Sequence, residues 1–289
     1  MKKGINFEYI LKNMRGFGEE DITKAMELCQ KHDFKYLDYL PDITRADYLE
    51  NARALKRQLQ KYGLRIWQSH APMFRYEKEL DIEHYKECLS KTIDVAKEVG
   101  AKYVVVHGDE YRWPEVQPYD VEKVLSLTHE LFAPFVEQAK EKQISIAFES
   151  LFEESHYFKY YMSPRFTSDV DHLIALVESF GEDSGVCICW DFGHAKVQYE
   201  EKAFKAFQKA FKYIKCTHVH DNTSGDNHLI PTLGDMDWQK YGSYMRENGY
   251  EGVLSFEFAY GHIPPQLMDG YLAFLQAVGE YLGSIVEKD

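Results

Sequence analysis

The amino-acid sequence predicts a single (β/α)8 barrel that covers residues 1–289. Strand-like and helix-like segments alternate eight times along the chain, and such alternation indicates parallel strands joined by helical crossovers. The length agrees, because about 250 residues are typical of a closed eight-stranded barrel. An open doubly wound sheet, the main alternative, would carry a glycine-rich phosphate-binding turn. Neither G-x-G-x-x-G nor a P-loop occurs in the sequence, so the closed barrel is favoured.

Each expected strand is a short run of β-branched and aromatic residues bounded by turn or helix signals. The expected strands are 4–7, 34–40, 64–70, 101–107, 144–149, 186–191, 214–220 and 253–258. Helices are expected where apolar residues recur at a period near 3.6, as they do at Ile22, Ala25, Met26 and Cys29. The expected helices are 19–33, 45–62, 82–99, 121–142, 169–180, 200–212, 237–248 and 265–287.

Composition limits the classes of partner. The net charge of −13 disfavours general attraction to nucleic acid or anionic membranes. No run approaches the roughly 20 apolar residues of a membrane span, and the first ten residues lack the apolar stretch of a signal peptide. The five cysteines form no C-x-x-C pair, which favours reduced core thiols in a cytoplasmic protein.

Charged or imidazole side chains end four successive expected strands. They are Glu149, Asp191, His218 and Glu257. The carboxyl ends of barrel strands share one mouth, where the active sites of this fold lie. Burying these charges together would be costly unless a cation neutralised them. The sequence therefore predicts a divalent metal site built from these four residues.

Five more candidate ligands are expected at the same mouth. His70 and His107 end the third and fourth strands, and His194 lies three residues after the strand-end Asp191. Asp226 and His228 lie in the loop after the seventh strand, where i, i+2 spacing in an extended segment would turn both side chains the same way. A mixed imidazole and carboxylate set suits one to three ions of zinc, manganese, magnesium, iron or cobalt, and the lack of thiolates argues against a closed structural zinc site.

Side-chain parity indicates a layer of small residues beneath these ligands. Successive strand residues point to opposite faces, so Ala147, Cys187, Cys189, Cys216 and Ser255 share the inward direction of the strand-end ligands. Barrel interiors are usually filled by bulky branched residues. The small side chains therefore suggest room for a ligand or water under the site. His220 shares the inward parity of His218 and could therefore face the site, or it could form a hydrogen bond to the next loop.

Several short motifs resemble the xylose isomerase-like barrel superfamily. They are His218-Val-His-Asp221, Asp226-Asn-His228, Pro231-Thr-Leu-Gly234, Asp237-Trp238, Asp191-x-x-His194 and the strand-eight Glu257. The resemblance spans almost the whole chain. The superfamily contains sugar and sugar-phosphate isomerases and epimerases, inosose dehydratases, and apurinic endonucleases of the endonuclease IV type, and these motifs separate its members poorly.

The resemblance implies different roles in different branches. In the isomerase and epimerase branch, the four strand-end residues match the ligands of one divalent ion. There Glu149 and Glu257 also match an acid/base pair that flanks the substrate, and His194 matches a substrate contact near the carbonyl. In the endonuclease branch, all nine candidates match ligands of a trinuclear zinc cluster.

The loops favour a sugar over DNA. A DNA enzyme is expected to have basic rim loops, whereas the loop after the seventh strand carries Asp221, Asp226, Asp235 and Asp237 with no Lys or Arg between them. The aromatic loop after the fifth strand suits a lid over a small polyol, although the same rings could stack a base or only cover the barrel top. Its aromatic residues are Phe152, Tyr157, Phe158, Tyr160, Tyr161 and Phe166. Arg112 and Arg165 are candidates for binding a substrate phosphate.

The sequence therefore predicts a divalent-metal-dependent sugar or sugar-phosphate isomerase or epimerase that transfers a proton through a metal-stabilised enediolate. Its expected partner is a small-molecule sugar or sugar phosphate, with self-association into a homo-oligomer left open and nucleic acid or membrane disfavoured. The alternatives are an endonuclease IV-type apurinic endonuclease, an inosose dehydratase-like lyase, and a barrel that binds a polyol without catalysis.

Overall fold

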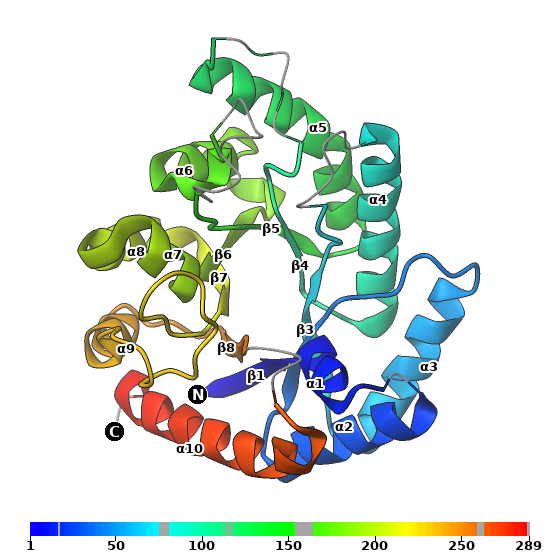
Figure 1. The fold of residues 1–289 in the computed structure, drawn as a ribbon. Coiled ribbons are helices and arrows are strands. Elements are labelled where there is room, and N and C mark those ends of the chain that lie inside the picture. The colour runs from blue at the N-terminus through cyan, green and yellow to red at the C-terminus, as the bar shows by residue number, and fades with distance from the viewer. Residues whose placement is uncertain are drawn as a thin grey trace.

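The computed structural model describes residues 1–16, 18–74, 81–111, 113, 116, 118–153, 164–258 and 263–287. Its eight parallel strands form one sheet in the order β7-β6-β5-β4-β3-β2-β1-β8, surrounded by helices (Figure 1). The strands are β1 (Lys2–Asn6), β2 (Tyr36–Tyr39), β3 (Arg65–His70), β4 (Tyr103–Val106), β5 (Ser145–Glu149), β6 (Cys187–Asp191), β7 (Ile214–His218) and β8 (Val253–Phe256). The predicted (β/α)8 barrel is confirmed.

The barrel closes between β7 and β8 through a short parallel bridge just beyond β7. Val219 donates its backbone N–H to the carbonyl of Ser255 at 2.8 Å, and Glu257 donates to the carbonyl of Val219 at 3.1 Å. The closure continues to the C-terminal end of β8, so it fixes Glu257 beside the end of β7.

The α-helices pack their apolar faces on the outside of the strands. They are α1 (Phe7–Met14), α2 (Glu19–Lys31), α3 (Tyr48–Lys61), α4 (Ile82–Val99), α5 (Val121–Glu141), α6 (Val170–Ser179), α7 (Phe192–Tyr199), α8 (Ala203–Ala210), α9 (Trp238–Glu247) and α10 (Met268–Val286). Short 3-10 helices are η1 (Phe166–Ser168), η2 (Glu182–Ser184), η3 (Glu200–Lys202), η4 (Phe211–Tyr213) and η5 (Pro265–Leu267). Within the described part of the chain, none of the helices is both long enough and apolar enough to cross a lipid bilayer.

Two helices at the mouth of the barrel differ from the expectation. Helix α1 begins directly after β1, where Asn6 caps it by accepting the N–H of Tyr9 at 3.2 Å. Helix α7 begins directly after β6, eight residues before the expected helix 200–212, because Asp191 acts as its N-cap and accepts the N–H of His194 at 2.7 Å. The turn η3, where Glu200 has a φ of 51°, separates α7 from α8.

The barrel interior is filled beneath the predicted site. Ala147, Cys187, Cys189 and Cys216 belong to one interior cluster with Trp67, Val105 and Val253. The expectation of open space under the ligands is therefore wrong, because the small residues of β5, β6 and β7 leave room that the Trp67 indole of β3 takes. All five cysteines are buried and free of disulfides.

Candidate metal centre

Four side chains from neighbouring strands converge at the carboxyl-terminal mouth of the barrel. Glu149, Asp191 and His218 are the last residues of β5, β6 and β7, and Glu257 directly follows β8. One ligand atom from each of the four lies within 4.8 Å of the others. The side chains are buried, with exposed fractions of 1, 0, 1 and 9% respectively. The structure therefore brings together all four residues that the sequence singled out.

His218 lies at the centre of this quartet. Its Nδ1 is 3.1 Å from Oε1 of Glu149, 3.2 Å from Oε2 of Glu257 and 3.7 Å from Oδ2 of Asp191. Its other nitrogen, Nε2, is 2.8 Å from Oδ2 of Asp38. A metal-binding histidine usually has its second nitrogen held in this way, which fixes the ring orientation. Sequence reasoning missed Asp38, although a carboxylate inside the apolar run of β2 was a usable signal.

The donor set fits a divalent cation. Three carboxylates with oxygens close enough to share one ion would repel one another, and burying an ionised carboxylate costs of order several kcal/mol when nothing compensates it. Carboxylate oxygens and an imidazole nitrogen are ligands that zinc, manganese, iron and cobalt accept. Glu149, Asp191, His218 and Glu257 are the residues that would hold such an ion.

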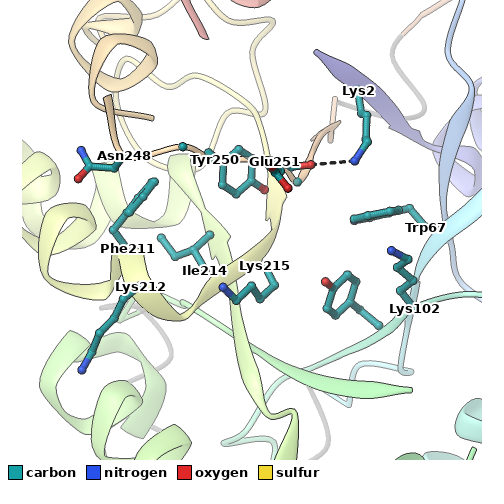
Figure 2. Close-up of a pocket in the computed structure, with 13 residues that line it drawn as sticks. Lys2, Trp67, Lys102, Phe211, Lys212, Ile214, Lys215, Asn248, Tyr250 and Glu251 are labelled. Atoms are coloured by element: carbon teal, nitrogen blue, oxygen red, sulfur yellow. Dashed lines mark hydrogen bonds between the residues drawn. The ribbon is translucent and has the colours of Figure 1, made fainter. Parts of the chain in front are cut away.

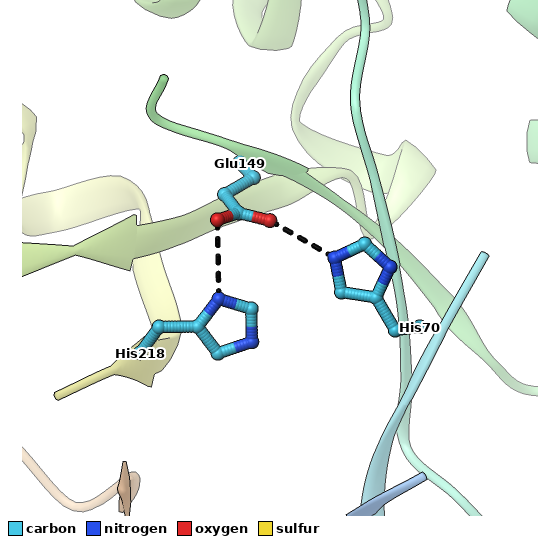
Figure 3. A group of neighbouring side chains, drawn as sticks. All are labelled: His70, Glu149 and His218. Atoms are coloured by element: carbon cyan, nitrogen blue, oxygen red, sulfur yellow. Dashed lines mark hydrogen bonds and ion pairs between the residues drawn. The ribbon is translucent and has the colours of Figure 1, made fainter. Parts of the chain in front are cut away.

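The second carboxylate oxygen of Glu149 faces two more predicted residues. Oε2 is 3.1 Å from Nε2 of His70 and 3.3 Å from Nε2 of His107, and Figure 3 shows Glu149 bridging His70 and His218. The Nδ1 of His107 is in turn 2.5 Å from Oε1 of Glu110. Glu110 was not expected at the site. It lies only three residues after His107 and orients that ring as Asp38 orients His218.

The remaining predicted ligands form a third group beside Asp191. Oδ2 of Asp226 is 3.3 Å from Nε2 of His228 and 3.8 Å from Nε2 of His194. His228 has a φ of 49°, so the expected extended segment is wrong, yet its side chain still meets Asp226. His220 joins this group, because its Nε2 is 3.0 Å from Oδ1 of Asp191 and its ring stacks on His228 at 4.1 Å.

The buried carboxylates and imidazoles shift each other's pKa values. Burial alone would raise the pKa of Glu149, but the adjacent His218 and hydrogen bonds from neighbouring histidines hold it well below its usual range. Burial alone would lower the pKa of His194, but Asp191, Glu149 and Asp226 raise it to about 9. Burial acts in the same direction on His228, whose pKa Asp226 raises to about 10. In the absence of a metal, protonated histidines therefore balance the negative charges of the ionised carboxylates.

Of the three predicted substrate-binding residues, His194 lies at the mouth of the barrel and Arg165 is buried in an ion pair. The ring of His194 is 5.1 Å from that of Phe152. Arg165 is buried, with an exposed fraction of 5%, and its Nη2 donates to Oδ1 of Asp109 at 2.9 Å. Arg112 lies outside the described residues.

The predicted aromatic lid is described only at its ends. The ring of Phe152 contacts that of His194. Phe166 is buried and its ring stacks on that of His172, with 5.1 Å between the centroids, so it packs inside the fold and does not form part of a lid. The other four aromatic residues of this loop, Tyr157, Phe158, Tyr160 and Tyr161, lie outside the described residues.

Residues 11–278 match the model of the xylose isomerase-like TIM barrel family. That match covers most of the sequence, and the chain belongs to this family.

Individual relatives are distant. The uncharacterized protein y4fM of Sinorhizobium fredii is 24% identical over 276 residues, which cover 83% of this chain and 81% of y4fM. The structure of a D-tagatose 3-epimerase-like protein is 22% identical with a TM-score of 0.73, covering 99% of this chain and 100% of that one. D-psicose 3-epimerase from Clostridium cellulolyticum H10, solved with D-tagatose, is 16% identical with a TM-score of 0.71 and full coverage of both chains, 100% each. At these identities, the two structures share the fold of this chain.

Proposed function

We propose that this protein is a divalent-metal-dependent sugar isomerase of the ketose epimerase or aldose–ketose isomerase type. The observation that carries the proposal is the convergence of Glu149, Asp191, His218 and Glu257 within 4.8 Å at the barrel mouth. Solved structures of the same fold named as D-psicose 3-epimerase and a D-tagatose 3-epimerase-like protein support a sugar as substrate.

The two glutamates would act as the acid/base pair. A bound divalent ion would supply Lewis-acid polarisation of a substrate carbonyl oxygen. One glutamate then removes the weakly acidic proton from the carbon next to the carbonyl, and the other glutamate returns a proton. β6 and β7 separate the strands that carry Glu149 and Glu257, so a sugar held between them would meet a carboxylate on each side. Return to the same carbon from the far side gives epimerisation, and return to the neighbouring carbon gives isomerisation.

Neighbouring side chains prepare this pair for proton transfer. Tyr9, carried by α1, donates its hydroxyl to Oε1 of Glu257 at 2.7 Å. His70 and His107 contact Oε2 of Glu149. These contacts fix the orientation of both carboxylates before substrate arrives, which lowers the cost of reaching a reactive geometry.

An unphosphorylated sugar is the favoured substrate. The guanidinium of Arg165 is engaged by Asp109 in a buried ion pair, and Lys196 pairs with Asp235 at 3.2 Å. A substrate phosphate would have to compete with these carboxylates.

The decisive experiment combines metal analysis with isotope exchange. The purified protein is expected to hold one manganese-like ion per chain and to incorporate deuterium from heavy water into a ketose from a panel of unphosphorylated and phosphorylated sugars. A protein loaded with metal that exchanges no substrate proton with any ketose would contradict the proposal and favour a polyol-binding barrel.

An apurinic endonuclease is the second candidate, and one observation favours it. Five more candidate ligands lie beside the quartet, so all nine of the candidate side chains are near one mouth of the barrel. The five are His70, His107, His194, Asp226 and His228. This function predicts about three zinc ions per chain and cleavage of abasic duplex DNA at low salt. An inert abasic oligonucleotide would remove it. A dehydratase-like lyase would instead release water from the sugar, which product analysis detects.

A further inference from the structure

The opposite, amino-terminal mouth of the barrel is strongly basic. Two adjoining cavities of about 550 and 690 Å³ open there and share Lys2, Trp67 and Lys102. We call these two cavities together the basal pocket. Its cationic side chains are Lys2, Lys56, Arg65, Lys102, Lys212 and Lys215. Among the described residues that line it, Glu251 is the single carboxylate.

This pocket is distinct from the metal centre. Lys2 begins β1, Lys102 directly precedes β4, and Lys215 is the second residue of β7. The metal-centre residues lie at the other ends of the strands, where His218 ends β7. The interior cluster around Trp67 fills the barrel between the two mouths, so a ligand in the basal pocket would not contact the substrate.

Two lysines share the indole ring at the floor of the pocket. The Nζ of Lys102 is 4.7 Å and that of Lys2 is 5.4 Å from the Trp67 ring centroid, and Figure 2 shows Trp67 between them. Lys2 also donates to the backbone carbonyl of Glu251 at 3.0 Å. An ammonium group has three N–H donors, so these contacts leave donors for a ligand.

Among the described residues, Lys212 is the one cation of the pocket with a carboxylate partner, Glu178 at 3.6 Å. Lys102 and Lys215 form no ion pair with any described residue, although the chain as a whole carries a net charge of −13. Like charges gathered in a concave site focus a positive potential and raise the local concentration of anions. An anion that contacts several of these lysines would relieve their mutual repulsion.

We propose that the basal pocket binds a small molecule that carries two or more linked phosphate groups. Cavities of several hundred Å³ have the size of small-molecule sites. Six cations spread over two adjoining cavities match a chain of phosphates better than a single phosphate, and lysine binds phosphate as a point charge. The acidic remainder of the chain disfavours an extended nucleic acid or an anionic membrane.

Inorganic tripolyphosphate is the probe for the test, with orthophosphate as the comparison. Calorimetric titration is expected to show one tripolyphosphate site per chain that binds more tightly than orthophosphate and weakens as salt is raised. Trp67 is expected to report binding through a change in its fluorescence, and Trp67→Phe should remove that signal while calorimetric binding persists. Equal affinity for the two anions would overturn the proposal.

Charge-reversal variants test whether tripolyphosphate binds in the basal pocket. Lys102→Glu is expected to weaken tripolyphosphate binding by about ten- to a hundredfold, the range for losing a charged hydrogen bond, whereas Lys102→Arg should retain it. The matched control is Lys24→Glu, which changes the net charge equally at an exposed position of α2 outside the pocket. Equal losses in Lys102→Glu and Lys24→Glu would show a general charge effect and sink the idea. Circular dichroism establishes that the variants are folded.

One further variant separates this proposal from the function of the metal centre. Tripolyphosphate chelates divalent metals, so the titration is repeated on Asp191→Asn after treatment with a chelator. Undiminished binding there supports the basal pocket, whether or not the protein is a sugar isomerase. Loss of binding in that variant would place the anion at the metal centre and overturn the proposal. Binding of anionic vesicles or duplex DNA in preference to tripolyphosphate would also overturn it.

Discussion

Oδ2 of Asp38 and Nε2 of His218 lie 2.8 Å apart inside the barrel, and each side chain is only 1% exposed. The contact decides which nitrogen of His218 faces the carboxylates of the metal centre. Gln68 also donates to Oδ2 of Asp38 at 3.0 Å, so the orienting carboxylate is itself held.

Replacing Asp38 by asparagine is therefore expected to weaken metal binding. The amide lacks the charge that stabilises the required form of the His218 ring, and loss of such a partner typically costs about 10- to 100-fold in metal affinity. Competition against a chelating dye measures the change. The control is Asp42→Asn, an exposed residue after β2 whose carboxylate accepts from Thr44. Unchanged affinity in Asp38→Asn would show that the Asp38 contact does not tune the site.

The metal-free protein is expected to lose stability as pH rises from about 6.5 to about 10. In the folded state, neighbouring carboxylates raise the pKa of His194 to about 9 and that of His228 to about 10, above the ordinary value of 6.5. The folded state therefore binds more protons than the unfolded state in this window, so the stabilisation is complete below pH 6.5 and disappears as the pH passes these raised values.

Thermal melting of chelator-treated protein across this range measures the effect. Returning the metal should reduce the decline, because the ion replaces the protons among the carboxylates. A metal-free melting temperature that stays level or increases between pH 6.5 and 9 would contradict this account.

Glu257→Gln is expected to lower the rate of proton exchange by about 10²- to 10⁴-fold, the usual contribution of a general acid or base. The amide keeps an oxygen that can face the metal but lacks the charge of the carboxylate, so the fold should change little and the rate is measured at saturating metal. Deuterium incorporation into the ketose measures the loss. Glu251→Gln is the matched control, since Glu251 lies two residues before β8, at the opposite mouth of the barrel. Exchange at the rate of the unmodified protein would remove Glu257 from the acid/base role.

Arg165→Met is expected to destabilise the fold by about 3–5 kcal/mol, because it removes the buried guanidinium that is paired with the buried carboxylate of Asp109. Urea denaturation measures the loss. Arg45→Met, which breaks the exposed pair with Asp47, should have little effect. If Arg165→Met were as stable as the unmodified protein but raised the KM for phosphorylated sugars alone, the sequence-based role in phosphate binding would be favoured instead.

Local sequence signals predicted the barrel well, and one helix that was not expected carries the same kind of signal. Phe7, Ile10, Leu11 and Met14 recur at helical spacing directly after β1 and form α1. In the same way, the charge of Asp38 inside an apolar run indicated a buried polar role. Both signals depend only on residues that are neighbours along the chain, so the sequence alone contains them.

The partners of the buried charges could not be predicted in this way. Asp38 and His218 are 180 residues apart, and Arg165 is 56 residues from Asp109. By itself, the sequence determined the eight-fold alternation and the placement of Glu149, Asp191, His218 and Glu257 at strand ends, because periodicity and strand boundaries are local properties. Only the tertiary structure decided which nitrogen of His218 faces the centre, whether Arg165 is free, and where the lysines of the basal pocket gather. Those outcomes depend on closure of the barrel, which brings distant strands together.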